Sequence, residues 1–194
     1  MKFFKENLHL ISRLFINQLG ITMFSIVLMM ASSKNSTVSL CFSIFSTLFY
    51  LYLIYTVMWE VGAKDALRIE QGRMEKYPAF PWKASFIASI PNFFIALLML
   101  VGFLFGYAFT SFDAARTRYV VMRLVVGLFE GMYVGIFSSL VSLLPNTDLV
   151  YAVSGTVFYA LSPLLMMGVS ALAYSLGIRN NYFLIPKQMP KKKG

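Results

Sequence analysis

The sequence contains few of the side chains that build catalytic and metal centres. Among its 194 residues there is one histidine, His9, and one cysteine, Cys41. A single cysteine excludes an internal disulfide, and one histidine excludes the two-histidine metal motifs. The sequence also contains no Gly-x-Ser-x-Gly motif and no phosphate-binding loop. We therefore predict no enzymatic activity, no metal site and no cofactor, and we expect Cys41 to be a buried, inert thiol.

Charged side chains are scarce and apolar ones abundant. Charged residues make up 13% of the sequence and hydrophobic residues 58%, whereas soluble domains carry about 25% charged residues. A membrane-spanning helix needs about 20 apolar residues. Five stretches reach that length, at about 10–31, 38–59, 84–109, 119–144 and 149–176. The sequence predicts a single all-α membrane domain over residues 1–194, with five or six transmembrane helices in a compact bundle.

The net charge of +9 would suggest nucleic-acid binding in a soluble protein. Here the basic residues stand at the ends of the apolar segments and in the tail, where they meet lipid headgroups. We therefore expect the lipid bilayer as a partner and no nucleic acid. The chain resembles the small polytopic proteins of bacterial cytoplasmic membranes, which is where we expect it to reside.

The first apolar segment has three possible interpretations. Residues 2–18 are amphipathic, and the fully apolar stretch 19–31 is too short to span a membrane alone. We favour one helix over about 10–31, with Asn17 and Gln18 facing other helices. A helix lying in the headgroup plane and a signal peptide remain the alternatives.

The positive charges and the number of apolar segments predict different topologies. The central loop, 60–83, and the tail, 178–194, are both rich in lysine and arginine, which predicts that both are cytoplasmic. Three apolar segments separate them, which places them on opposite sides. One of these segments enters and leaves on the same side, or the last one is broken at Pro163, or the orientation is weakly set. We favour the first two explanations.

The central loop carries opposite charges at helical spacing. The pairs are four or three residues apart: Glu60 with Lys64, Asp65 with Arg68, and Glu70 with Arg73. This pattern predicts a helix that continues out of the second segment and weakens or ends at Gly72. Two interpretations stay open, namely a solvated extension and a docking helix for a protein partner.

The fourth segment contains glycines at every fourth position, Gly127, Gly131 and Gly135. Such a stripe lets another helix approach closely. The sequence leaves open whether that helix belongs to the same chain or to a second copy.

Glu130 lies beside this stripe, about 16 Å along the helix from Tyr119 at a rise of about 1.5 Å per residue. A carboxylate near the middle of a membrane is costly and is a functional candidate. It either makes structural hydrogen bonds or belongs to a polar site for a proton, a cation or a solute. The other candidates for this site are Arg123, two turns earlier, Asn92 beside Pro91, Asn17 and Gln18.

These features predict a small transporter, or the membrane subunit of one, for a small solute or ion. The alternative is a non-transporting accessory or assembly protein. It would dock partners through residues 60–76 and through the face formed by Gly127, Gly131 and Gly135.

Overall fold

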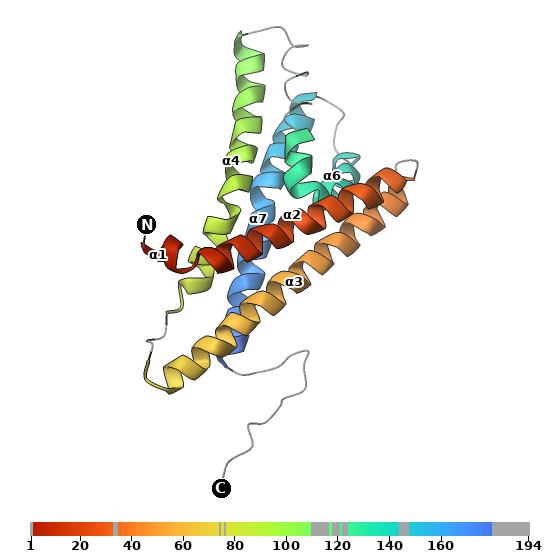
Figure 1. Ribbon diagram of the computed structural model, residues 1–194. Helices are drawn as coiled ribbons and strands as arrows, with labels where there is room; N and C mark the ends of the chain where they lie inside the picture. Colours follow the sequence, from red (N-terminus) through yellow and green to blue (C-terminus); the bar gives the residue numbers. More distant parts are fainter. Residues whose placement is uncertain are drawn as a thin grey trace.

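The computed structural model describes residues 2–32, 35–73, 75, 77–109, 117, 121, 124–143 and 148–179. Over these residues the chain is helical and has no β-strand. Five stretches are long and apolar enough to cross a membrane, which confirms the predicted all-α, multi-pass architecture (Figure 1). The elements are α1 (Lys2–Glu6), α2 (Leu8–Ala31), α3 (Ser36–Glu70), α4 (Phe80–Phe109), η1 (Gly131–Tyr133), α6 (Val134–Val141) and α7 (Asp148–Ile178). A helical stretch over 124–130 leads into η1.

The outer surface of the bundle is apolar. Large side chains such as Val27, Leu48 and Leu124 are exposed, whereas many serines and threonines are buried. A protein surrounded by lipid can have this distribution, because apolar side chains lose nothing by facing hydrocarbon. Cys41 lies on the exposed side of α3, so the prediction of a buried thiol is wrong.

Helices α2 and α3 form an antiparallel pair (Figure 1). Near one end of the pair, Asn35 caps α3 because its side-chain oxygen accepts hydrogen bonds from the backbone N–H groups of Thr37 and Val38. Toward the other end, the Arg13 guanidinium lies 3.2 Å from the Glu60 carboxylate. The pairing thus brings the start of α2 beside the charged end of α3.

The charged continuation of α3 ends in a glycine cap. Gly72 has φ +67, a conformation that glycine adopts without steric cost. Its N–H donates to the Ile69 carbonyl, and the N–H of Arg73 donates to the Arg68 carbonyl, which is the Schellman arrangement. The predicted helix extension is therefore present. The expected Glu70–Arg73 ion pair is not among the contacts of the described chain, because Arg73 already lies beyond the helix end.

Helices α4 and α7 run antiparallel and share a face of small polar side chains. Ser85, Ser89, Asn92 and Ala96, which the sequence places on one face of the third segment, are all buried. The Ser89 hydroxyl lies 3.5 Å from the sulfur of Met166 on α7. Helix α7 continues through Pro163, so the predicted break at that proline is wrong.

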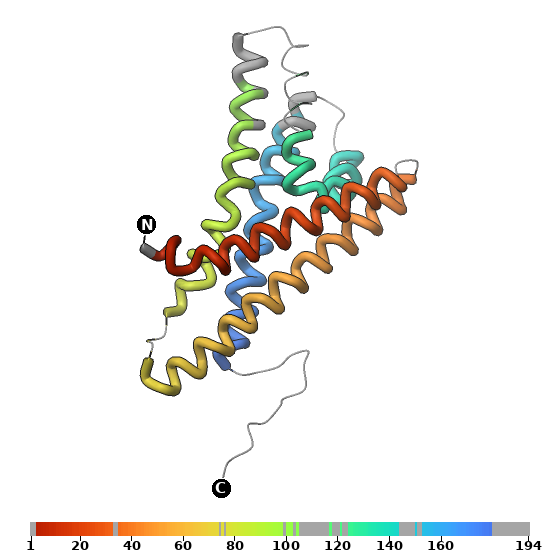
Figure 2. The backbone as a smooth tube through the Cα atoms, in the orientation of Figure 1, coloured from red at the N-terminus to blue at the C-terminus, as the bar shows by residue number. Residues whose placement is uncertain are grey.

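Helices α3 and α7 are parallel, and glycines bring their backbones together. A Cβ added to Gly62 would lie 2.4 Å from the Tyr174 carbonyl oxygen, and one added to Gly177 would lie 2.4 Å from the Trp59 carbonyl oxygen. The last turn of α7 therefore lies beside the charged end of α3 (Figure 2). The bundle end that carries the α3–α4 connector, residues 71–79, is called the connector end below.

The fourth apolar segment does not run from one end of the bundle to the other. The stretch 124–130 approaches from the end where α4 finishes, and the chain then turns at η1 (Figures 1 and 2). After the turn, α6 lies against the start of α3, because a Cβ on Gly135 would lie 2.5 Å from the Ser39 carbonyl oxygen. The segment thus enters and leaves at the same end, which is the first of the three arrangements expected from the charges.

Candidate functional site

Glu130 occupies the break in the fourth segment. It is the last residue of the stretch 124–130 and the residue that precedes η1. Its side chain is 2% exposed, and the Ser162 hydroxyl on α7 donates a hydrogen bond to its Oε2 atom. The fold therefore holds a carboxyl group inside the bundle at a point where the backbone leaves the α-helical path.

Side chains of α2 bond to a backbone carbonyl at the break. The Gln18 amide and the Thr22 hydroxyl both donate to the Phe129 carbonyl oxygen, at 3.1 and 3.0 Å. A backbone group without a partner is costly inside a membrane, so irregular backbone occurs there only where protein or water satisfies it. Two polar side chains of α2 supply these hydrogen bonds to Phe129, the residue that precedes Glu130.

Ser43 of α3 forms hydrogen bonds with backbone groups on the other side of the break. Its hydroxyl donates to the Met132 carbonyl and accepts the N–H of Ile136 at 3.3 Å. One buried serine thus bridges η1 and the first turn of α6. The bent segment is held by side chains from two other helices.

Two tyrosines lie near the carboxyl group. Tyr50 and Tyr133 are buried and close enough to Glu130 for an electrostatic interaction. The Tyr133 ring packs edge-on against Phe158 of α7, with centroids 6.3 Å apart. The ion pairs found within the described ranges all lie toward the connector end, and none of them involves Glu130.

The structure brings together only part of the predicted polar site. Gln18 reaches the break, where it bonds the residue next to Glu130. Asn92 is buried on α4, and its side-chain oxygen has no hydrogen-bond partner among the residues that the structure describes. Asn17 is half-buried and forms no hydrogen bond to Glu130. Arg123 lies outside the described residues.

The glycine stripe faces other helices of the same chain at two of its three positions. A Cβ on Gly131 would lie 2.9 Å from the Ile26 side chain of α2, and Gly135 packs on the backbone of α3. Gly127 has open space around it. The sequence interpretation did not identify Gly62 and Gly177, since neither has a second glycine at the motif spacing.

The residues considered for docking are largely engaged within the chain. Glu60 contacts Lys64 at 2.7 Å as well as Arg13. Asp65 is 4% exposed. It accepts a hydrogen bond from the Tyr174 hydroxyl at 3.0 Å and lies 3.2 Å from Arg68. The charge spacing identified the Glu60–Lys64 and Asp65–Arg68 pairs, but it contained no signal for the contacts with Arg13 and Tyr174.

Two cavities lined by described residues open at the connector end. The larger, of about 580 Å³, lies between α1, α3, the connector and the start of α4. The smaller, of about 260 Å³, lies between the start of α4 and the end of α7 and includes Trp82 and Arg179 in its walls. Neither cavity includes Glu130. Within the described ranges, no three histidine, cysteine or acidic side chains come close enough to hold a metal ion.

Comparisons with models of known protein families, with curated proteins and with solved structures find no match for this chain.

Proposed function

We propose that this chain is a small transporter, or the membrane subunit of one, that moves a small solute or ion with Glu130 as its central polar group. The observation that carries this proposal is the buried carboxyl group at the break of a segment that enters and leaves at one end of the bundle. An acidic side chain at membrane depth is costly and is by default a functional candidate. Broken helices in transporters place binding groups near the membrane midplane.

The surroundings of Glu130 favour a transported or coupling proton over a metal cation. A cation such as Na⁺ needs several oxygen ligands, but the nearby Phe129 and Met132 carbonyls already accept hydrogen bonds from Gln18, Thr22 and Ser43. A proton needs only the carboxyl group itself and a hydroxyl that adjusts its hydrogen bond. Ser162 provides that hydroxyl.

Proton flux into proteoliposomes is the direct test. Vesicles that contain the purified protein and a pH-sensitive dye receive an inside-negative potassium diffusion potential, and their internal acidification is recorded. We expect wild-type vesicles to acidify faster than protein-free vesicles. Glu130→Gln should return the rate to the protein-free level, because the amide keeps the shape of the side chain and cannot exchange the proton.

Glu70→Gln is the matched control, because Glu70 is an exposed carboxylate at the end of α3. It should leave the flux unchanged. If wild-type and Glu130→Gln vesicles acidify at the same rate, Glu130 is not the proton-carrying group. If Glu130→Gln also loses its cooperative thermal unfolding, a structural role for Glu130 is the better account.

The accessory-protein alternative is supported by one observation. Leu67, Glu70 and Arg73 are exposed at the end of α3, and the ion pairs of the described chain involve neither charged residue. If this surface binds a protein, reversal of the Arg68 and Arg73 charges should remove that protein from a pull-down. Unchanged co-purification would argue against docking.

A further inference from the structure

The larger cavity at the connector end has apolar walls and a charged opening. The rings of Phe3, Tyr77 and Phe80 line it, as does the aliphatic side chain of Val61. Its volume of about 580 Å³ lies within the range of small-molecule sites, about 300–1,000 Å³. The cavity is therefore large enough for a polar headgroup together with the first part of an apolar chain.

Positive charge lines the α3 wall of this cavity. Lys64 and Arg68 stand one helical turn apart, and both contribute to the lining. Each contacts one carboxylate, yet their side chains remain 64% and 62% exposed. Most of each cationic group is therefore open to a ligand.

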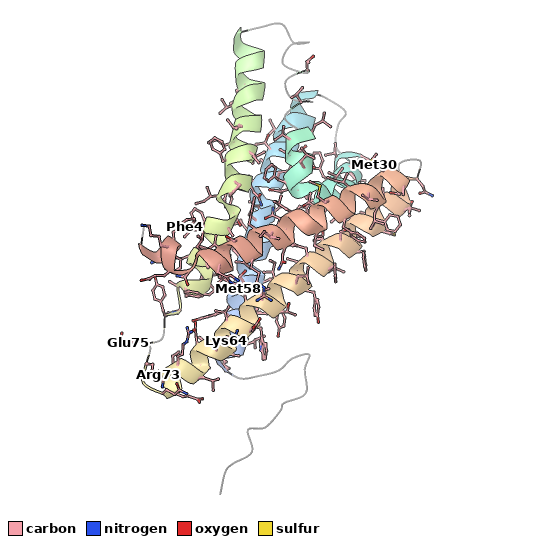
Figure 3. All side chains as sticks on the ribbon, in the orientation of Figure 1. Phe4, Met30, Met58, Lys64, Arg73 and Glu75 are labelled. Atoms are coloured by element: carbon pink, nitrogen blue, oxygen red, sulfur yellow. The ribbon has the colours of Figure 1, made fainter. Side chains whose placement is uncertain are left out.

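Two further carboxylates come from other parts of the lining. Glu6 comes from α1 and Glu75 from the connector, and the ion pairs within the described chain involve neither. Lys64 and Glu75 lie at the same end of the bundle as Phe4 (Figure 3). The opening thus presents two negative groups together with two cations on the α3 wall.

Side chains next to the cavity are of the kinds that meet the headgroup region of a membrane. Trp82, two residues after Phe80, is exposed, and exposed tryptophans concentrate at membrane–water interfaces. Phe4 and Leu8, next to the cavity residues Phe3 and Asn7, are exposed apolar side chains. A molecule that places a charged headgroup in the cavity can therefore extend its apolar chains along α1 and α2.

We propose that this cavity binds the headgroup of a zwitterionic phospholipid, with its phosphate at Lys64 and Arg68 and its ammonium between Glu6 and Glu75. Charge of both signs in the lining favours a ligand that also carries both signs. An anionic lipid would meet the same cations, but it would leave Glu6 and Glu75 unpaired and repelled. This site is separate from the proposed transport site and does not depend on it, because Glu130 is not part of the lining.

Native mass spectrometry of the detergent-purified protein tests this assignment. The protein is mixed with equal amounts of phosphatidylethanolamine and phosphatidylglycerol that carry the same acyl chains, and the ratio of the two bound lipids is measured. We expect the wild type to retain phosphatidylethanolamine in excess. Glu6→Gln combined with Glu75→Gln should lower that ratio about fivefold, as expected for the loss of two largely exposed charge contacts.

Glu70→Gln is again the matched control, because it removes an exposed carboxylate of α3 that does not line the cavity. It should leave the ratio unchanged. Glu6 and Glu75 are exposed and belong to none of the ion pairs among the described residues, so the double variant should unfold at the wild-type temperature. A wild-type ratio of one or below, or an unchanged ratio in the double variant, would overturn the proposal. An equal drop in Glu70→Gln would also overturn it, because the effect would then follow overall charge.

Discussion

Gly177 controls how closely α7 approaches α3. The Cβ of an alanine at this position would lie 2.4 Å from the Trp59 carbonyl oxygen and 2.9 Å from the Ala63 nitrogen. Both are backbone atoms, which cannot rotate away. We therefore expect Gly177→Ala to lower the free energy of unfolding by about 1–3 kcal/mol, the usual cost of overpacking. Unfolding in mixed micelles with increasing denaturing detergent measures this change.

Gly168→Ala is the control for that measurement. Gly168 lies on the same helix, and an added Cβ would meet nothing within 4 Å. Alanine is a better helix former than glycine by about 1 kcal/mol, so this variant should be as stable as the wild type or more stable. Equal destabilisation by both substitutions would show that the contact between α3 and α7 is not tight at Gly177.

Individual polar residues differ in how well the sequence identifies them. Glu130 and Gln18 stand out because such side chains are rare and costly within apolar segments, and both are buried. Ser162 and Tyr174 do not stand out, because hydroxyl side chains are common in these segments. Their roles depend on which helix lies opposite, and the pattern within one segment does not contain that information.

The bent fourth segment depends on a side chain of another element. Ser43 of α3 bonds both Met132 and Ile136, on the two sides of the bend. Ser43→Ala would remove the hydrogen-bond partner that this serine provides to a carbonyl and to an N–H group in a buried place. We expect a loss of about 1–2 kcal/mol in the free energy of unfolding, since polar contacts inside membrane proteins contribute up to about that much.

Ser46→Ala is the matched control on the same helix. Ser46 is also buried, but its hydroxyl has no hydrogen-bond partner in the described part of the chain. Its removal should change stability by no more than about 0.5 kcal/mol. If both serine variants behave alike in the same detergent titration, the bend is not held by Ser43.

The sequence predicts the long helices more readily than the break in the fourth segment. The apolar stretches at 10–31 and 84–109 correspond to α2 and α4, whose composition follows the width of a membrane. Pro163 suggested a break, but α7 continues through it. The chain instead breaks at Gly131–Tyr133, which contains no proline. The groups that stabilise this break come from α2 and α3, so a local pattern could not reveal it.

The distribution of positive charge over the whole molecule agrees with a re-entrant fourth segment. The sequence between α2 and α3 and between Phe109 and Leu124 contains four of the 17 basic residues: Lys34, Arg116, Arg118 and Arg123. Of the other 13, eight are described residues at or near the connector end, namely Lys2, Lys5, Arg13, Lys64, Arg68, Arg73, Lys83 and Arg179. The remaining five belong, in the sequence, to the connector or to the stretch after Arg179. If all five segments crossed the membrane, the 17 basic residues would divide almost evenly between its two sides. From this distribution, the positive-inside rule predicts that the connector end is cytoplasmic.

Single reporter cysteines, in a chain with Cys41→Ser, test this topology. Gln71→Cys and Arg179→Cys mark the connector end, and Thr37→Cys and Leu143→Cys mark the opposite end; all four positions are exposed. With an impermeant thiol reagent on intact cells, we expect Thr37 and Leu143 to be labelled. Gln71 and Arg179 should be labelled only after permeabilisation.

Five plain spans predict a different pattern for two of these positions. Leu143 would then share the side of Gln71, and Arg179 would share the side of Thr37. The pair Leu143 and Arg179 therefore discriminates between the two topologies, whereas Gln71 and Thr37 report only the overall orientation. Labelling of Arg179 together with protection of Leu143 would contradict the re-entrant segment. The bend at Glu130 would then lie within a full crossing, without the return to one side that supports its assignment as a transport site.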